Sequence, residues 1–261
     1  MKPDYEKNGV TLYCADCREI LPTLDAVDHV ITDPPFSEVT HKGHNVVSAN
    51  ENGILYDGVA RNKLHYESWA DVDATEFINQ ISPICSAWMV IFNDDVLAPA
   101  IRNAMDKCGR YAFAPLPFYA PGSRVRLSGD GPSSWTIWIM VSRTKAQSRW
   151  GTLPGGYLAQ EGWRDREYMG GKPVKLMEAI VGDYSRKGDL ILDPYMGSGT
   201  TGVAAVKLQR RFIGIEINPE SFEIAVRRIE AAFDETSLLD YAQTQEQLDL
   251  AGSMATERGG R

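Results

Sequence analysis

Short apolar runs alternate with amphipathic stretches along most of the chain. Apolar positions three and four residues apart predict helices, as in residues 174–181 directly after Pro173. Asn218 followed by Pro219 predicts the cap and the first position of a later helix. Seven runs rich in apolar or β-branched residues predict strands, at about residues 10–14, 28–32, 88–93, 111–118, 135–142, 189–193 and 211–216.

Strands that alternate with helices predict an α/β fold. We expect a Rossmann-like, seven-stranded and mostly parallel sheet with helices on both faces. The runs 111–118 and 135–142 are joined by a polar loop, so they predict an antiparallel hairpin. Residues 37–68 and 143–171 show no periodicity and predict long irregular loops, which are usually functional in a compact domain.

The composition fits one large domain. At 261 residues with 43% hydrophobic content, the chain can bury a full core. We expect residues 1–233 to form this domain and residues 234–261 to form a polar C-terminal helix and tail.

No segment resembles a signal peptide or approaches the roughly 20 apolar residues that span a bilayer, so we expect a cytoplasmic protein with no membrane contact.

The cysteines and histidines do not predict a metal site. The four cysteines are too few and too scattered for a disulfide framework, and Cys14 and Cys17 lack the second ligand pair that a structural zinc site needs. We therefore expect free thiols. His41 and His44 lie in a polar, glycine-containing stretch that predicts a solvated loop, and we expect no metal.

The charge of the chain is uneven. The net charge of −8 argues against a uniformly basic surface for nucleic acid. Residues 96–175, however, contain 12 Lys and Arg against 5 Asp and Glu, whereas the rest of the chain contains 15 against 30. The middle of the chain is therefore locally electropositive, which fits either a solvated face or a surface that binds phosphates.

The stretch DLILDPYMGSGTTGVAAVKLQRRFIGIEIN, residues 189–218, has the order strand, glycine turn, helix, strand and acid. Glycines let the backbone turn sharply and expose amide N–H groups at the start of a helix, where a negative group can bind. Glu216, at the end of the second strand, stands where a carboxylate can accept hydrogen bonds from two ribose hydroxyls. This pattern predicts a site for an adenosine-type cofactor.

A nicotinamide-dependent oxidoreductase is the alternative for this stretch. Gly197, Gly199 and Gly202 spell the G-x-G-x-x-G of a dinucleotide-binding fold, with an acid about 20 residues further on. That fold continues with a second half-sheet, and only 45 residues follow Glu216. The sequence therefore disfavours a dinucleotide.

A second motif, ITDPPF, follows from the strand expected at residues 28–32. It places Asp33 at the carboxyl edge of the sheet, where open α/β sheets bind ligands. Pro34 and Pro35 stiffen the backbone and leave carbonyl oxygens unpaired, while Phe36 offers a flat apolar face. Asp33 and a free carbonyl then form a pair of acceptors that suits a planar base carrying an exocyclic NH2 group.

Such a pocket predicts chemistry at that amine. The lone pair of an exocyclic amine is delocalised into the base, and two acceptors that hold its hydrogens favour the tetrahedral geometry that frees it. A base inside a duplex must first be flipped out and stacked, which the ring of Phe36 would support.

Together, the two motifs resemble those of the S-adenosylmethionine-dependent amino-methyltransferases of DNA, in the permuted class whose D-P-P-Y/F motif precedes the D-P-F-x-G-S-G-T-T loop. The resemblance covers residues 9–232 and includes CAD at Asp16 and GKPVKLMEAI around Lys172. It implies a permuted class I methyltransferase fold, S-adenosylmethionine as cofactor and DNA as partner. Members of the family often form homodimers.

The resemblance also implies two sets of site residues. The base site and catalysis are assigned to Asp33, Pro34, Pro35 and Phe36. The cofactor site is assigned to Asp16, Lys172, Asp193, Gly197, Ser198, Gly199, Thr200 and Glu216.

Several positions differ from the family pattern, and they affect the expected DNA contacts and the expected target base. Phe36 stands where tyrosine is commoner, and YMGG replaces the H-P-T-Q that often precedes Lys172 and its proline. The target-recognition segment is confined to residues 143–171, so we expect these residues and residues 37–68 to contact DNA. Asp33 favours the N6 amine of adenine, because members that act on the N4 amine of cytosine more often carry serine. N4-cytosine is the alternative.

Overall fold

The structure is a computed structural model that describes residues 1–45, 67–120, 136–144, 150–159 and 171–236. Its centre is a sheet of parallel strands, which lie side by side in the order β2 (Val10–Cys14), β10 (Arg211–Glu216), β9 (Leu190–Asp193), β3 (His29–Thr32) and β4 (Trp88–Asn93). Their carboxyl ends therefore meet at one edge of the sheet.

Further strands extend both ends of this parallel centre. β1 (Tyr5–Lys7) pairs antiparallel with β2 at one end, and β7 (Thr136–Arg143) pairs antiparallel with β4 at the other. β7 also pairs antiparallel with β5 (Tyr111–Ala112) and β6 (Leu116–Tyr119), and β8 (Tyr157–Leu158) runs parallel to β6 at the outer edge.

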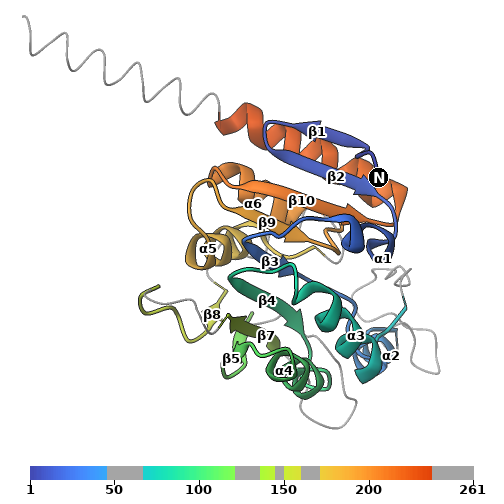
Figure 1. Ribbon diagram of the computed structural model, residues 1–261, viewed down its shortest axis with the longest axis vertical. Helices are drawn as coiled ribbons and strands as arrows, with labels where there is room; N and C mark the ends of the chain where they lie inside the picture. The colour runs from blue at the N-terminus through green and yellow to red at the C-terminus, as the bar shows by residue number, and fades with distance from the viewer. Residues whose placement is uncertain (46–66, 121–135, 145–149, 160–170, 237–261) are drawn as a thin grey trace, which may run out of the picture.

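Helices cover both faces of the sheet (Figure 1). One face is covered by α5 (Val174–Tyr184), α6 (Thr200–Lys207) and a C-terminal helix of residues 219–236. The other face is covered by α1 (Cys17–Ile20), α3 (Asp71–Ile81) and α4 (Ala98–Lys107). A one-turn 3-10 helix, Leu21–Thr23, directly follows α1.

Successive side chains along each strand point to opposite faces of the sheet, so the core consists of two layers, one on each face. Val90 and Phe92 of β4 belong to the layer with α5 and α6, whereas Met89 and Ile91 belong to the layer with α3 and α4. All four side chains are fully buried, and burial of each contributes roughly 1.5–3 kcal/mol. The core therefore holds the strand ends, where the expected site residues lie, in fixed positions.

The α/β architecture confirms the fold predicted from the sequence, including the antiparallel pairing of residues 111–118 with residues 135–142. The predicted number of strands is wrong, because ten strands instead of seven lie within the described residues. β1 and β8 have three and two residues, which is too short for an alternating pattern to show.

The predicted strand at residues 111–118 is two strands, β5 and β6. Pro115 lies between them and has no N–H to donate to the sheet. Ala112 faces Ser142 and Leu116 faces Ile139, so a step of four residues opposes a step of three on β7. The extra residue forms a bulge that the apolar pattern alone does not reveal.

Two segments expected to be irregular contain regular structure. Residues 37–68 include α2 (Glu38–Asn45), and residues 143–171 include β8. The rest of the expected loops lies largely outside the described residues, at residues 46–66, 121–135, 145–149 and 160–170.

The sequence also predicts features of the cysteines, His41 and the C-terminal helix. All four cysteines are free, as predicted. His41 lies in α2 and is buried, so its assignment to a solvated loop is wrong. The C-terminal helix begins as predicted, since Asn218 Oδ1 accepts a hydrogen bond from Ser221 N at 3.0 Å. It runs through residue 233 to residue 236, and residues 237–261 lie outside the described part.

In the part of the chain that the structure describes, no helix combines the length and the apolar character needed to cross a bilayer.

Two helical glycines give a matched test of the packing. A Cβ at Gly202 in α6 would lie 2.6 Å from Ile229 Cδ1 and 2.8 Å from Phe212 Cε1, whereas a Cβ at Gly182 in α5 would have no atom within 4 Å. We expect Gly202→Ala to lower the free energy of unfolding by about 1–3 kcal/mol through overpacking. We expect Gly182→Ala to raise it by up to about 1 kcal/mol, because alanine favours a helix. Urea denaturation measures both, and equal effects would contradict the close packing of α6.

Candidate active site

Four acidic residues lie in a row along one edge of the sheet. β2, β10, β9 and β3 are parallel neighbours in that order, so their carboxyl ends meet. Asp16 follows β2, Glu216 ends β10, Asp193 ends β9 and Asp33 follows β3. The structure thus brings together the acids that the sequence assigns to the cofactor and base sites.

Asp193 joins the end of β3 to the glycine turn. It is 2% exposed, and its Oδ1 and Oδ2 accept hydrogen bonds from Thr32 Oγ1 and Thr201 Oγ1, both at 2.6 Å. Burial raises the pKa of Asp193 to about 6, against the lowering effect of these hydrogen bonds. Because Thr32 directly precedes Asp33, the base motif is held beside the glycine turn.

The glycine turn after β9 has a backbone geometry that glycine permits. Gly197 and Gly199 have φ angles of +52° and +81°, and Gly199 is the N-cap of α6. Glu216 contacts the turn from β10, since its Oε2 accepts a hydrogen bond from Gly197 N at 2.9 Å and its Oε1 accepts one from Asn218 N at 2.8 Å. Burial raises the pKa of Glu216. The carboxylate is therefore fixed against the turn by backbone amides.

The neighbouring end of β2 contributes Asp16. It is the N-cap of α1, and it accepts hydrogen bonds from Arg18 N and Arg18 Nε, each at 2.9 Å. The hydrogen bonds from the Arg18 side chain lower the pKa of Asp16. Ala15 N donates to Glu216 O at 3.1 Å, so Asp16 and Glu216 lie on adjacent chain segments.

Two features beside the turn leave room for a ligand. A Cβ at Gly197 would meet no atom within 4 Å, so the space next to its Cα is open. Ile217, directly after Glu216, is 65% exposed and presents an apolar side chain at this edge. Sequence analysis does not single out Ile217, although a large apolar residue directly after the acid is a usable signal.

The base motif contacts Lys172. The Lys172 Nζ forms an ion pair with Asp33 Oδ2, and it lies 5.3 Å from the ring centroid of Phe36 and 5.2 Å from that of Phe92. Asp33 Oδ1 is buried and has no hydrogen-bond partner among the described residues. A carboxylate, an ammonium group and two aromatic rings therefore meet at the end of β3. Lys172, which the resemblance assigns to the cofactor, contacts the base motif in this structure.

Asp94, which sequence analysis does not single out, holds the residues that follow the base motif. It lies after β4, is 1% exposed, and accepts hydrogen bonds from Ser37 N and Leu97 N, each at 3.0 Å, and from the hydroxyls of Ser37 and Thr40. Burial alone would raise the pKa of Asp94, but the hydrogen bonds lower it below its usual value. An acid directly after a buried strand is the sequence signal for this residue.

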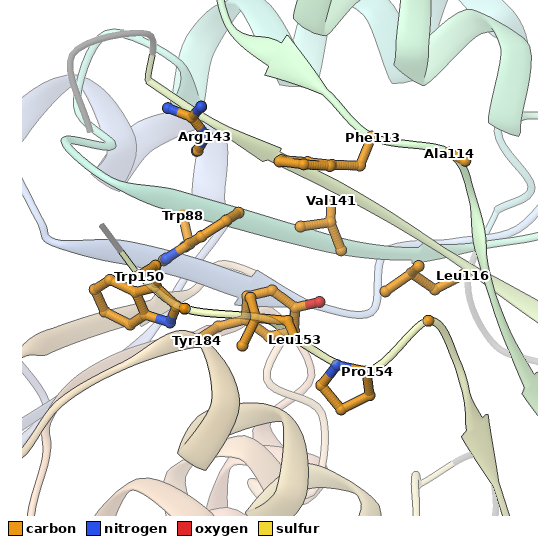
Figure 2. Close-up of a pocket in the computed structure, with 12 residues that line it drawn as sticks. Trp88, Phe113, Ala114, Leu116, Val141, Arg143, Trp150, Leu153, Pro154 and Tyr184 are labelled. Carbon is orange, nitrogen blue, oxygen red and sulfur yellow. The ribbon is translucent and has the colours of Figure 1, made fainter. Parts of the chain in front are cut away.

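A pocket of about 560 Å³ lies at the opposite edge of the sheet (Figure 2). It is lined by Trp88 at the start of β4 and Arg143 at the end of β7, together with Trp150 and Tyr184. The four acids lie at the other ends of the parallel strands, so this aromatic pocket is separate from them. The hydrogen-bonded row of acids, rather than this cavity, defines the candidate active site.

Comparison with known sequences identifies similar enzymes. A family model described as DNA methylase matches residues 125–227. The type II methyltransferase M2.DpnII of Streptococcus pneumoniae is 26% identical over 273 residues, which cover 88% of this chain and 93% of the relative. The DNA adenine methyltransferase YhdJ of Escherichia coli is 46% identical over 61 residues, which cover 23% of this chain and 21% of the relative.

Comparison with solved structures defines the fold. M1.HpyAVI in its SAM complex matches with a TM-score of 0.60 and 23% identity, covering 84% of this chain and 99% of that chain. PvuII DNA methyltransferase, cytosine-N4-specific, matches with a TM-score of 0.63 and 14% identity, covering 90% and 95%. The fold is therefore that of the class I S-adenosylmethionine-dependent methyltransferases, with ten strands within the residues that the structure describes.

The role of Asp94 can be tested by its pH dependence. Because the pKa of Asp94 is lowered in the folded protein, its stabilising effect is present above the usual carboxyl pKa of about 4 and is lost as the pH falls through the lowered value. We expect Asp94→Asn to lower the free energy of unfolding by about 1.5–3 kcal/mol at pH 7, and by less in acid.

Urea denaturation at both pH values measures this difference. Asp25→Asn, at an exposed position before β3, is the control and should change stability by no more than about 0.5 kcal/mol. A loss that is the same at neutral and acidic pH would contradict a role for the Asp94 charge.

Proposed function

We propose that this chain is a DNA methyltransferase that transfers a methyl group from S-adenosylmethionine to the exocyclic N6 amine of adenine. The observation that carries the proposal is the hydrogen-bonded link through Asp193, which holds the base motif at Asp33 beside the glycine turn. The similarity to named DNA methyltransferases supports it, and the name of YhdJ supports adenine as the target.

The cofactor end of the row fits S-adenosylmethionine. Glu216 is positioned to accept hydrogen bonds from ribose hydroxyls, Ile217 offers an apolar surface for the adenine ring, and the space beside Gly197 is open. When bound, S-adenosylmethionine supplies an electrophilic methyl group on a sulfonium. Asp16, Lys172, Asp193, Ser198, Gly199 and Thr200 stay proposed members of this site.

The base end of the row fits a flipped nucleobase. Asp33 and a carbonyl oxygen of the Pro34–Pro35 segment would accept the two amine hydrogens, and Phe36 would stack on the ring. This hydrogen bonding would free the nitrogen lone pair to displace the thioether of S-adenosylhomocysteine from the methyl carbon, and an Asp33 oxygen would take the proton that the methylated amine releases. Lys172 Nζ contacts Oδ2 of the same carboxylate, so we propose that this ion pair shifts when the amine binds.

The proposal extends to the DNA surface, the class and the assembly. Most of residues 37–68 and 143–171, which we propose contact DNA, lie outside the described residues. We place the chain in the permuted class because the base motif precedes the cofactor turn along the chain. We propose a homodimer on the resemblance alone, and a role in restriction–modification on the resemblance and the names of the type II relatives.

A second candidate function is methylation of the N4 amine of cytosine. The fold of the chain is also that of a cytosine-N4-specific enzyme. Asp33 favours adenine by the resemblance, and a fold alone does not choose between the two bases. The nicotinamide alternative gains no support from the reported comparisons, which are to methyltransferases.

Nucleoside mass spectrometry distinguishes the two bases. We expect enzymatically amplified genomic DNA, which carries no prior modification, to gain N6-methyladenine when treated with the purified protein and S-adenosylmethionine. This expectation rests on Asp33, which favours adenine by the resemblance. N4-methylcytosine without N6-methyladenine would replace the adenine assignment, and no methylated base at all would refute the proposed function.

Replacement of Asp33 separates binding from chemistry. We expect Asp33→Ala to keep its affinity for S-adenosylhomocysteine within about threefold and to lower kcat by about 10²- to 10³-fold, because the acceptor for the amine is lost. Calorimetry and a labelled-methyl assay measure the two effects. Asp25→Ala, at an exposed position before β3, is the control and should keep both. Full turnover in Asp33→Ala would show that the base site lies elsewhere.

A further inference from the structure

Arg228 of the C-terminal helix contacts the glycine turn at three oxygen atoms. Its Nη1 donates hydrogen bonds to Ser198 O at 2.6 Å, to Ser198 Oγ at 3.0 Å and to Thr200 Oγ1 at 3.2 Å. One nitrogen of the guanidinium thus bridges the two residues that flank Gly199. Hydrogen bonds from a charged donor are roughly twice as strong as neutral ones.

The same face of the C-terminal helix packs directly on the turn and on α6. A Cβ at Gly199 would lie 2.8 Å from Ala225 Cβ, and a Cβ at Gly202 would lie 2.6 Å from Ile229 Cδ1. Ala225, Arg228 and Ile229 have the spacing i, i+3 and i+4, so they share one face of this helix. The two glycines allow the close approach, and Arg228 adds a polar contact at its centre.

These contacts determine which groups of the turn face a ligand. The hydroxyls of Ser198 and Thr200 accept hydrogen bonds from Arg228, so they are turned toward the C-terminal helix. On the other side, Glu216 accepts the Gly197 N–H. The turn is therefore held between Glu216 and Arg228, two residues of opposite charge on different elements.

We infer that Arg228 is a positioning residue that fixes the glycine turn in the form that binds the adenosine cofactor. The inference rests on the proposed function and adds a residue outside both sets assigned from the sequence. Arg228 acts through Ser198 and Thr200, and it does not itself reach the reacting atoms. Without it, the turn would lose its only contacts from a charged donor among those that the structure describes for Ser198 and Thr200.

The adjacent arginine provides a matched control. Arg227 lies on the same helix and is exposed, so Arg227→Met and Arg228→Met remove the same charge from neighbouring positions. Calorimetry with S-adenosylhomocysteine should show affinity weaker by about tenfold or more for Arg228→Met and within about twofold of wild type for Arg227→Met. Arg228→Lys keeps a charged donor and should recover part of the affinity.

Steady-state kinetics on amplified genomic DNA separates positioning from a general structural role. We expect Arg228→Met to raise the KM for S-adenosylmethionine while kcat at saturating cofactor stays within about threefold of wild type. A loss of kcat with unchanged KM would overturn the assignment. If Arg228→Met folds poorly, Arg228→Gln, which keeps polarity but removes the charged donor, carries the same test, and affinity equal to wild type in the folded variant would also overturn the assignment.

The two proposals fail in different ways. If the wild-type protein binds S-adenosylhomocysteine and the Arg228 variants bind it equally well, the inference about Arg228 is wrong and the proposed function stands. If the wild-type protein does not bind S-adenosylhomocysteine, the proposed function fails and the inference fails with it.

Discussion

The buried carboxylate of Asp193 is the interaction on which the geometry of the site depends. A carboxylate that is 2% exposed is costly unless it is hydrogen-bonded, and its two oxygens are satisfied by Thr32 on one side and Thr201 on the other. These partners belong to the strand that ends at the base motif and to the helix that begins at the glycine turn. Stability of the fold and the position of Asp33 beside the glycine turn therefore depend on the same pair of hydrogen bonds.

Two further residues, Asp94 and Arg228, fix other parts of the site by hydrogen bonds. Asp94 fastens the residues after the base motif to the start of α4, and Arg228 fastens the glycine turn to the C-terminal helix. Both contacts join segments that are far apart in the sequence. Asp94 accepts a hydrogen bond from the Ser37 N–H group, and Arg228 donates one to the Ser198 carbonyl oxygen. The open side, next to Gly197 and the exposed Ile217, is left for ligands.

Much of this arrangement follows from the sequence, because it depends on local patterns. Buried runs and glycine turns predict the parallel centre of the sheet, and acids at strand ends predict the row from Asp16 to Asp33. The short edge strands, the bulge between β5 and β6, and the anchors Asp94 and Arg228 are not predicted. β1, which pairs with its sequence neighbour β2, and β8 are too short for a two-residue period to show, whereas the bulge and the two anchors depend on contacts between segments far apart in the chain.

The four acids of the row differ in the groups that contact their carboxylates. Asp193 is held by buried hydroxyls, Glu216 by backbone amides, and Asp16 by the nearby Arg18. Asp33 is paired with the ammonium of Lys172, a compact charge on a flexible stem. An amine that acquires a methyl group becomes positively charged in the same place. Under the proposed function, a cation that forms on the substrate would therefore take the place of the Lys172 ammonium beside Asp33.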